Sequence, residues 1–192
     1  MNINVKRIGL ILLIFLWATM SWAQEMAVAV NTQFTLFSKI LAFDRNLKTR
    51  RHDEIVIGIV YQSRFRTSLN VKNEILRIAG EYSTRKIEGI PIRYIPIDLG
   101  DETDLESAIS TNSVNVLYIA PLRVLEIAGI TRISRAKRII TLTGVPDYVE
   151  SGLAIGIGTK GEKPQILINL AAAKAEGANL SSELLKLSKV IK

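Results

Sequence analysis

The stretch Ile55-Val-Ile-Gly-Ile-Val-Tyr61 is apolar without interruption and rich in β-branched residues. A strand with one solvent-facing side alternates apolar and polar residues, whereas a strand covered by helices on both faces does not. The stretch therefore predicts a central strand in a helix-covered sheet.

The segments after this strand alternate between helical and extended patterns. Strands are predicted at 92–99, 114–120 and 139–143, and helices at 71–82, after Asp101 and at 122–130. Such alternation predicts a mostly parallel sheet with right-handed crossovers. Residues 153–157 and 165–169 flank a glycine-containing turn and predict an antiparallel hairpin, and 182–190 have the spacing of a final amphipathic helix. We therefore expect an α/β fold: a mostly parallel sheet from βαβ units flanked by helices, with a C-terminal antiparallel hairpin and a closing helix.

Residues 26–47 precede the first strand and have helical spacing. Their apolar arc is wider than a helix needs to cover one core face. Two interpretations follow: the helix is wedged deep in its own domain, or part of it docks against a second copy or another protein. The candidate partner or dimer face consists of Phe34, Phe37, Ile40 and Leu41.

The N-terminus has the pattern of a secretory signal peptide. Lys6 and Arg7 precede an apolar run, and Ser21-Trp-Ala23 places small residues where a signal peptidase cuts. We expect residues 1–23 to be removed, leaving one domain at 24–192 in the periplasm. Loss of Lys6 and Arg7 lowers the formal net charge from +7 to +5, which gives little reason to expect a nucleic-acid partner.

The composition and motifs give no enzyme constellation. The chain has no cysteine and one histidine, which excludes disulfides, thiol catalysis, iron–sulfur clusters and multi-histidine metal centres. Gly156-Ile-Gly-Thr-Lys-Gly161 has the spelling of a dinucleotide fingerprint, but another strand follows it instead of a helix, so we interpret it as a turn. We expect no catalytic residues, no metal and no cofactor.

Two charged clusters are interpreted as structural. The acidic residues from Asp98 to Asp104 suit a helix start, and Asp101 is the predicted cap. The basic residues from Arg132 to Arg138 lack interleaved aromatic residues for base stacking and are assigned to a solvated turn.

A ligand of an open parallel sheet binds beyond the carboxyl ends of its strands. In this sequence those ends form a candidate ligand or partner crevice lined by Tyr61, Gln62, Ser63, Asp98, Pro121, Thr143 and Gly144.

The C-terminal third resembles the YfiR family of small exported proteins. The resemblance rests on Gly144-Val-Pro-Asp-Tyr-Val-Glu-Ser-Gly152, on the strand end Ile168-Asn-Leu-Ala-Ala172 and on Ser181-Ser-Glu-Leu-Leu-Lys-Leu187. It extends more loosely back to Ile55 and to the first predicted helix. The best-known members are periplasmic repressors that bind the sensor domain of a membrane-bound diguanylate cyclase and so restrain cyclic-di-GMP synthesis and biofilm formation.

The resemblance implies a non-enzymatic regulator whose partner is a membrane-bound signalling protein, either a diguanylate cyclase or a sensor kinase. The disulfide-based redox gating of those members does not carry over, because this chain has no cysteine. The residues alone leave two other hypotheses open: a small-ligand binding domain that serves a transporter or sensor, and a homodimer formed through the first helix.

Overall fold

The computed structural model describes residues 26–47, 53–82, 84, 86–99, 104–123 and 127–191. The predicted signal peptide lies outside these residues. Asp101 also lies outside them, and its predicted role as a cap is corrected: the helix begins at Leu105, and its N-cap is Asp104, whose carboxylate accepts from the N–H groups of Glu106 and Ser107. Within the described ranges, no helix combines the length and the apolar composition that a bilayer-spanning segment requires.

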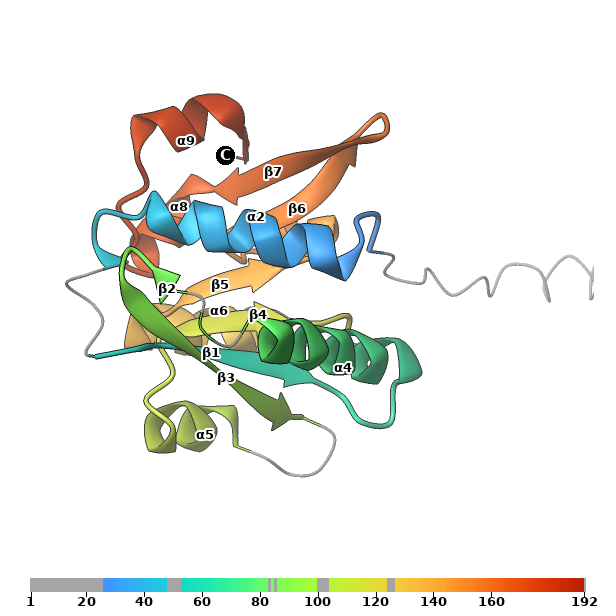
Figure 1. Cartoon of the computed structure of the whole chain (residues 1–192). Helices are drawn as coiled ribbons and strands as arrows, with labels where there is room; N and C mark the ends of the chain where they lie inside the picture. The colour runs from blue at the N-terminus through green and yellow to red at the C-terminus, as the bar shows by residue number, and fades with distance from the viewer. Residues whose placement is uncertain are drawn as a thin grey trace, which may run out of the picture.

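One mixed sheet forms the centre of the molecule, with the strand order β2-β3-β1-β4-β5-β6-β7-β8 (Figure 1). Neighbouring strands from β3 through β1, β4 and β5 to β6 are parallel, whereas β2–β3 and β6–β7 are antiparallel. The bounds are β1 Ile55–Tyr61, β2 Lys86–Ile87, β3 Ile90–Asp98, β4 Val116–Ile119, β5 Ile140–Thr143, β6 Ile155–Lys160, β7 Lys163–Asn169 and β8 Lys189–Ile191. This mostly parallel sheet confirms the predicted α/β class.

Helices cover both faces of the sheet. Their bounds are α2 Val30–Ala42, α4 Arg66–Glu81, α5 Leu105–Thr111, α6 Ile127–Lys137, α7 Pro146–Glu150, α8 Leu170–Ala175 and α9 Ser182–Leu187. Helices α2 and α4 pack side by side on one face, and their buried residues belong to the same core cluster as Leu184 of α9. The buried residues of α5 and α6 belong to a second cluster on the other face.

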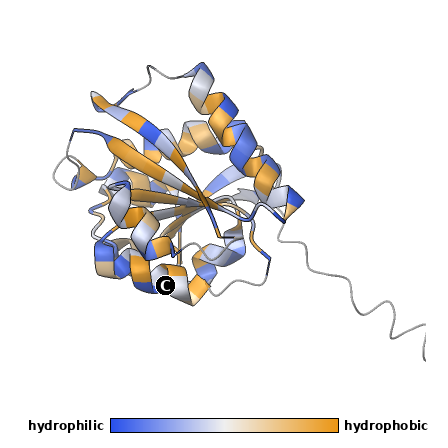
Figure 2. Ribbon diagram, turned by 90° about the horizontal axis from the view of Figure 1, so that it is seen from below, coloured by the Kyte–Doolittle hydropathy of each residue, from blue (hydrophilic) through white to orange (hydrophobic). Residues whose placement is uncertain are grey.

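Strand β1 shows why its sequence is apolar throughout. Ile55, Ile57 and Ile59 belong to the cluster beneath α2 and α4, whereas Val56 and Val60 belong to the cluster beneath α5 and α6. Both faces of β1 are therefore buried, as predicted, and Figure 2 shows hydrophobic residues running through the centre of the sheet.

Two predicted elements between β4 and β5 are corrected. The helix expected at 122–130 is instead α6, and the basic run from Arg132 to Arg138 falls mostly within α6 rather than in a turn. Its charged residues Arg132 and Arg135 are exposed, while Ile130 and Ser134 are buried. The run is therefore the solvent side of an amphipathic helix.

The C-terminal region contains more elements than predicted. The hairpin is present as β6 and β7, which pair from Ile155 opposite Ile168 to Lys160 opposite Lys163. The closing helix α9 ends at Leu187 rather than 190, and the next residues form β8, parallel to β7. Helices α7 and α8 and strand β2 were also not predicted; α7 and α8 are only five and six residues long.

Candidate functional site

The carboxyl ends of the parallel strands bring the predicted crevice residues to one edge of the sheet. Tyr61 at the end of β1 lies opposite Asp98 at the end of β3. The backbone N–H of Ser63 donates to Asp98 Oδ1 at 3.0 Å. Thr143 ends β5 and is buried, and its hydroxyl donates to the backbone oxygen of Ile119 at 3.0 Å.

The chain's own side chains close this edge between β1 and β4. The Gln62 side chain accepts from the Arg123 N–H at 2.8 Å and donates to the Arg123 backbone oxygen at 3.2 Å. The Arg123 guanidinium also lies 4.8 Å from the centre of the Phe65 ring, in cation–π geometry. The two loops after β1 and β4 are therefore joined across the crevice.

Helix α2 fills the crevice at the end of β5. Gln33 is fully buried and packs so closely on Gly144 that a Cβ at Gly144 would overlap its amide group. The Gln33 amide donates to the Val28 backbone oxygen at 2.6 Å, and its oxygen accepts from the Tyr118 hydroxyl at 2.9 Å. Pro121, another predicted crevice residue, is also buried. The predicted residues thus come together, but around the domain's own polar groups.

Burial also changes the acidity of nearby phenols. It raises the pKa of the Tyr118 hydroxyl well above its ordinary value, so this group stays protonated and remains a hydrogen-bond donor. At the crevice rim, burial and the neighbouring Asp98 charge raise the pKa of Tyr61. Neither phenol is therefore available as a base near neutral pH.

The candidate partner face on α2 lies in the core in this structure. Phe34, Phe37, Ile40 and Leu41 are all at most 8% exposed. Phe37 packs edge-on against Tyr118, with ring centroids 5.9 Å apart. The wide apolar arc is explained by the domain itself, because α2 contacts the sheet and α4 at once. In this structure these four side chains are therefore buried within the domain.

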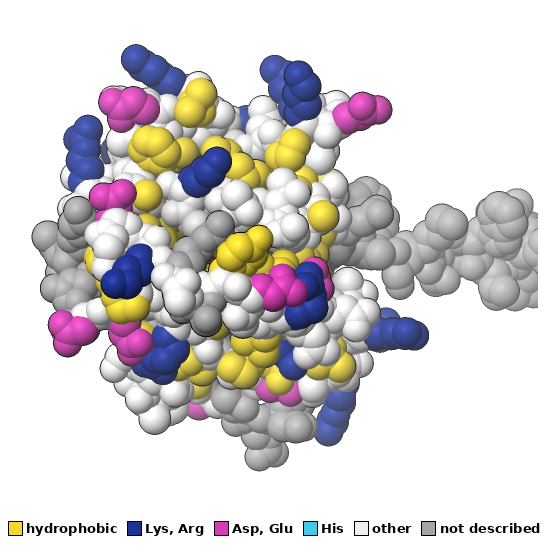
Figure 3. Space-filling model, in the orientation of Figure 1, with side chains coloured by type: hydrophobic (Ala, Val, Ile, Leu, Met, Phe, Trp, Pro, Cys, Tyr) yellow, Lys and Arg dark blue, Asp and Glu magenta, His cyan; other side chains and the backbone are white. Residues whose placement is uncertain are grey.

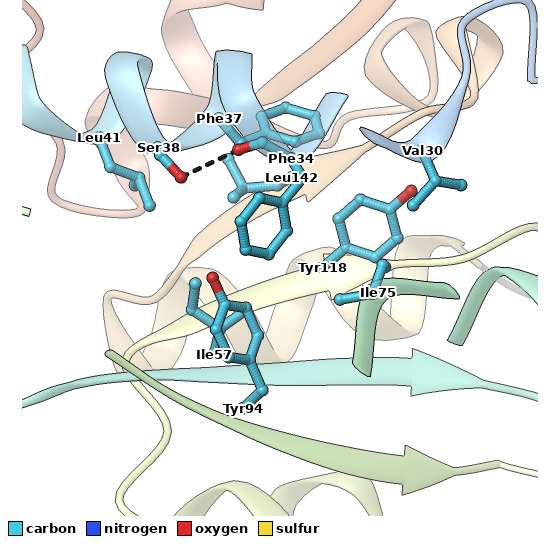
Figure 4. Close-up of a pocket in the computed structure, with 10 residues that line it drawn as sticks. All are labelled: Val30, Phe34, Phe37, Ser38, Leu41, Ile57, Ile75, Tyr94, Tyr118 and Leu142. Carbon is cyan, nitrogen blue, oxygen red and sulfur yellow. Dashed lines mark hydrogen bonds between the residues drawn. The ribbon is translucent and has the colours of Figure 1, made fainter. Parts of the chain in front are cut away.

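A small apolar cavity of about 30 Å³ remains between α2, α4 and the sheet (Figure 4). Phe34 and Phe37 point into it from α2, and Tyr94 and Tyr118 face it from the sheet. A space of this size is large enough to hold a water molecule. A larger ligand would require α2 to move.

A wider groove of about 460 Å³ shares the lining residues Phe34 and Tyr94 with this cavity. Three stacked rings connect the two spaces: Phe34 lies 5.6 Å from Tyr94 and 6.4 Å from Tyr82, centroid to centroid. Tyr82 is 48% exposed. We call this surface the aromatic groove; it is lined by Phe34, Glu54, Leu76, Ala79, Tyr82, Ile92, Arg93 and Tyr94.

An ion pair forms the polar rim of the aromatic groove. Arg93 Nε donates to both carboxylate oxygens of Glu54, at 2.9 and 3.0 Å. Hydrogen bonding from Arg93 lowers the pKa of Glu54, so the pair remains ionised. On the face of the molecule drawn in Figure 3, side chains of both charges lie among hydrophobic ones.

Sequence reasoning missed Gln33, Tyr82 and Tyr94. Gln33 carried a usable signal, because it lies one helical turn before Phe37 on the apolar side of the helix. A buried amide at such a position needs partners. Tyr82 and Tyr94 carried no comparable signal, since their stacking depends on how α4 and β3 meet α2.

The family comparison decides the relationship. Residues 35–189 match the YfiR/HmsC-like family. The chain belongs to this family. No protein with a curated function matches the sequence. The YfiR resemblance inferred from the C-terminal third is thereby confirmed over most of the chain.

Solved structures confirm the fold of this YfiR/HmsC-like chain. A conserved domain protein from Vibrio cholerae O1 biovar El Tor superposes with a TM-score of 0.59 at 16% identity, covering 85% of this chain and 60% of that one. The ABC domain in complex with L-Trp from Streptococcus pneumoniae gives 0.58 at 12% identity, covering 83% and 62%. A substrate binding protein with adhesive properties from Clostridium difficile, in its ligand-free, open form, gives 0.51 at 18% identity, covering 80% and 59%. The chain spans about three fifths of each of these structures.

Proposed function

We propose that this protein is an exported, non-enzymatic regulator that acts by binding a membrane-bound signalling protein, either a diguanylate cyclase or a sensor kinase. The observation that carries the proposal is the family match over residues 35–189. The closed crevice supports it, because Gln62 and Arg123 bond to each other, and Gln33 bonds to Val28 and Tyr118, where a substrate would have to sit. We place the regulator in the periplasm, released there by removal of residues 1–23.

The aromatic groove is the contact surface that we assign to this partner. Its stack of rings runs from the buried Phe34 to the half-exposed Tyr82. Binding energy in protein interfaces concentrates on such aromatic residues when they are surrounded by polar groups that exclude water. The Arg93–Glu54 pair provides that rim. An apolar side chain of the sensor domain would cover Tyr82 and extend the stack.

The test is co-purification from membranes of the native host with tagged mature protein. The expected result is specific enrichment of a diguanylate cyclase or a sensor kinase in mild detergent. Tyr82→Ala should reduce that recovery at least tenfold. Leu187→Ser is the matched control, because Leu187 is 73% exposed on α9 and does not line the groove.

The outcomes separate the parts of the proposal. Equal recovery with Tyr82→Ala and the unchanged protein would move the contact surface away from the aromatic groove. Failure to enrich any signalling protein, with the tagged chain folded, would contradict the regulatory function itself.

A second candidate function is binding of a small ligand for a transporter or sensor. It is favoured by the fold shared with a substrate binding protein and with a domain in complex with L-Trp. A ligand at the carboxyl ends of the strands would have to displace Gln33 and separate Gln62 from Arg123. A thermal-shift screen against metabolites tests this, because ligand binding stabilises the folded state. No shift with any compound would contradict it.

A further inference from the structure

The connector between α8 and α9, residues 176–181, is held at each end by a different buried carboxyl group, that of Asp44 and that of Glu176. At the α9 end, Asp44 Oδ1 accepts from the Asn179 N–H at 2.8 Å, and the Ser181 N–H donates to the Phe43 oxygen at 3.0 Å. At the α8 end, Glu176 is fully buried between α6 and β5. The connector therefore ties the C-terminal end of α2 to the opposite layer of the domain.

The Glu176 carboxyl group bonds to both elements that pack on it. The Thr141 N–H of β5 donates to Oε2 at 2.8 Å, and the Thr141 hydroxyl donates to Oε1 at 2.9 Å. On α6, Ser134 Oγ lies 2.8 Å from Oε1. The Thr141 hydroxyl in turn accepts from the Ala154 N–H at 2.8 Å.

The Ser134 hydroxyl can accept a hydrogen bond from the Glu176 carboxyl group when that group is protonated. Its hydroxyl carries one hydrogen but lies within bonding distance of two acceptors, Glu176 Oε1 and the Thr131 backbone oxygen at 3.1 Å. When Glu176 is protonated, its O–H donates to Ser134 Oγ and Ser134 donates to Thr131. When Glu176 is ionised, Ser134 must donate to the carboxylate and its bond to Thr131 is lost.

We propose that Glu176 is a proton-operated latch. The protonated carboxyl group holds the connector 176–181 against α6 and β5, and loss of the proton loosens it. The connector would then release its contacts with Phe43 and Asp44, so the C-terminal end of α2 would gain freedom. This device is independent of the identity of the signalling partner.

The charges around Glu176 determine where it titrates. Burial raises its pKa to about 7, and the hydrogen bonds from Thr141 and Ser134 and the charge of Arg135 on α6 offset part of that rise. Lys174, the charged residue of α8 itself, is exposed. Because the folded-state pKa is higher than the ordinary value of 4.5, the latch contributes its full stability below that value and loses it as the pH rises through about 7.

Hydrogen exchange of the connector amides measures the latch directly. In the unchanged protein, after correction for intrinsic exchange, protection of residues 176–181 should fall with pH by up to about tenfold per unit between pH 5 and 7, as expected for one linked proton. Glu176→Gln keeps the shape of the protonated group and should make this protection independent of pH. Glu162→Gln, in the exposed β6–β7 turn, is the control and should behave like the unchanged protein.

A second measurement does not depend on a folded variant. In protein labelled with carbon-13 at the glutamate carboxyl groups, one resonance should titrate near pH 7, well separated from the others. The proposal is overturned if every glutamate finishes its titration below pH 6, or if connector protection is the same at pH 5 and pH 8.

Discussion

Gln33 and Glu176 are both fully buried and both satisfied by hydrogen bonds, Gln33 on the α2 side of the sheet and Glu176 between β5 and α6. Gln33 packs on Gly144 just beyond the end of β5, whereas Glu176 bonds to Thr141 within it. The amide of Gln33 is uncharged at every pH, while the carboxyl group of Glu176 must give up a proton to become ionised. Burial therefore fixes the position of both side chains but makes only the side chain of Glu176 sensitive to pH.

The largest effect on stability is expected from replacing Gln33, the uncharged residue of the two. Gln33→Leu would leave the Val28 oxygen and the Tyr118 hydroxyl without their partner in the core. Each buried unsatisfied group costs about 1–3 kcal/mol, so we expect the free energy of unfolding to fall by about 3 kcal/mol. Urea denaturation measures this. A change below 1 kcal/mol would mean that water or another side chain replaces the amide.

Gly144→Ala disturbs the packing of Gln33 from the end of β5. The added Cβ would overlap the Gln33 amide, and overpacking of this kind costs about 1–3 kcal/mol. Gly129→Ala in α6 is the matched control, since a Cβ there meets no atom within 4 Å. The control should be neutral or more stable by up to about 1 kcal/mol, because alanine favours helix. Equal thermal midpoints for the two variants would contradict the close packing.

Tyr118→Phe is expected to have the smallest effect on stability. It removes one hydroxyl from Gln33, with an expected loss of about 1 kcal/mol. The loss should be the same at pH 5 and pH 8, because burial keeps the phenol protonated throughout this range. Denaturation at both values checks this. A loss of stability that changes with pH would show that the Gln33 and Glu176 hydrogen-bond groups are coupled through β5.

The sequence predicted best those elements whose pattern is set by burial of the whole strand. For β1 the predicted and observed bounds agree, because uninterrupted apolar residues are required when both faces are covered. The hairpin was predicted because its two strands are adjacent in the chain and separated by a turn.

The elements that were missed depend on distant partners. Strand β8 follows α9 directly, and its three residues become a strand by pairing with Leu167–Asn169 of β7. The predicted crevice residues do share one edge of the sheet, yet their closure by Gln33 depends on where α2 docks. The spacing of apolar residues predicts which face of α2 is buried, but not which part of the sheet that face covers.

The edge strands of the sheet bear on the behaviour of this protein in concentrated solution. An open strand edge can pair with another molecule and begin a fibre. Here Lys163 and Pro164 of β7 and Lys189 of β8 are exposed, and Pro164 has no N–H to donate. Repeated stacking of this edge would bring like charges together. Replacement of both lysines and the proline by valine would remove that protection, and we expect the variant to aggregate more readily than the unchanged protein.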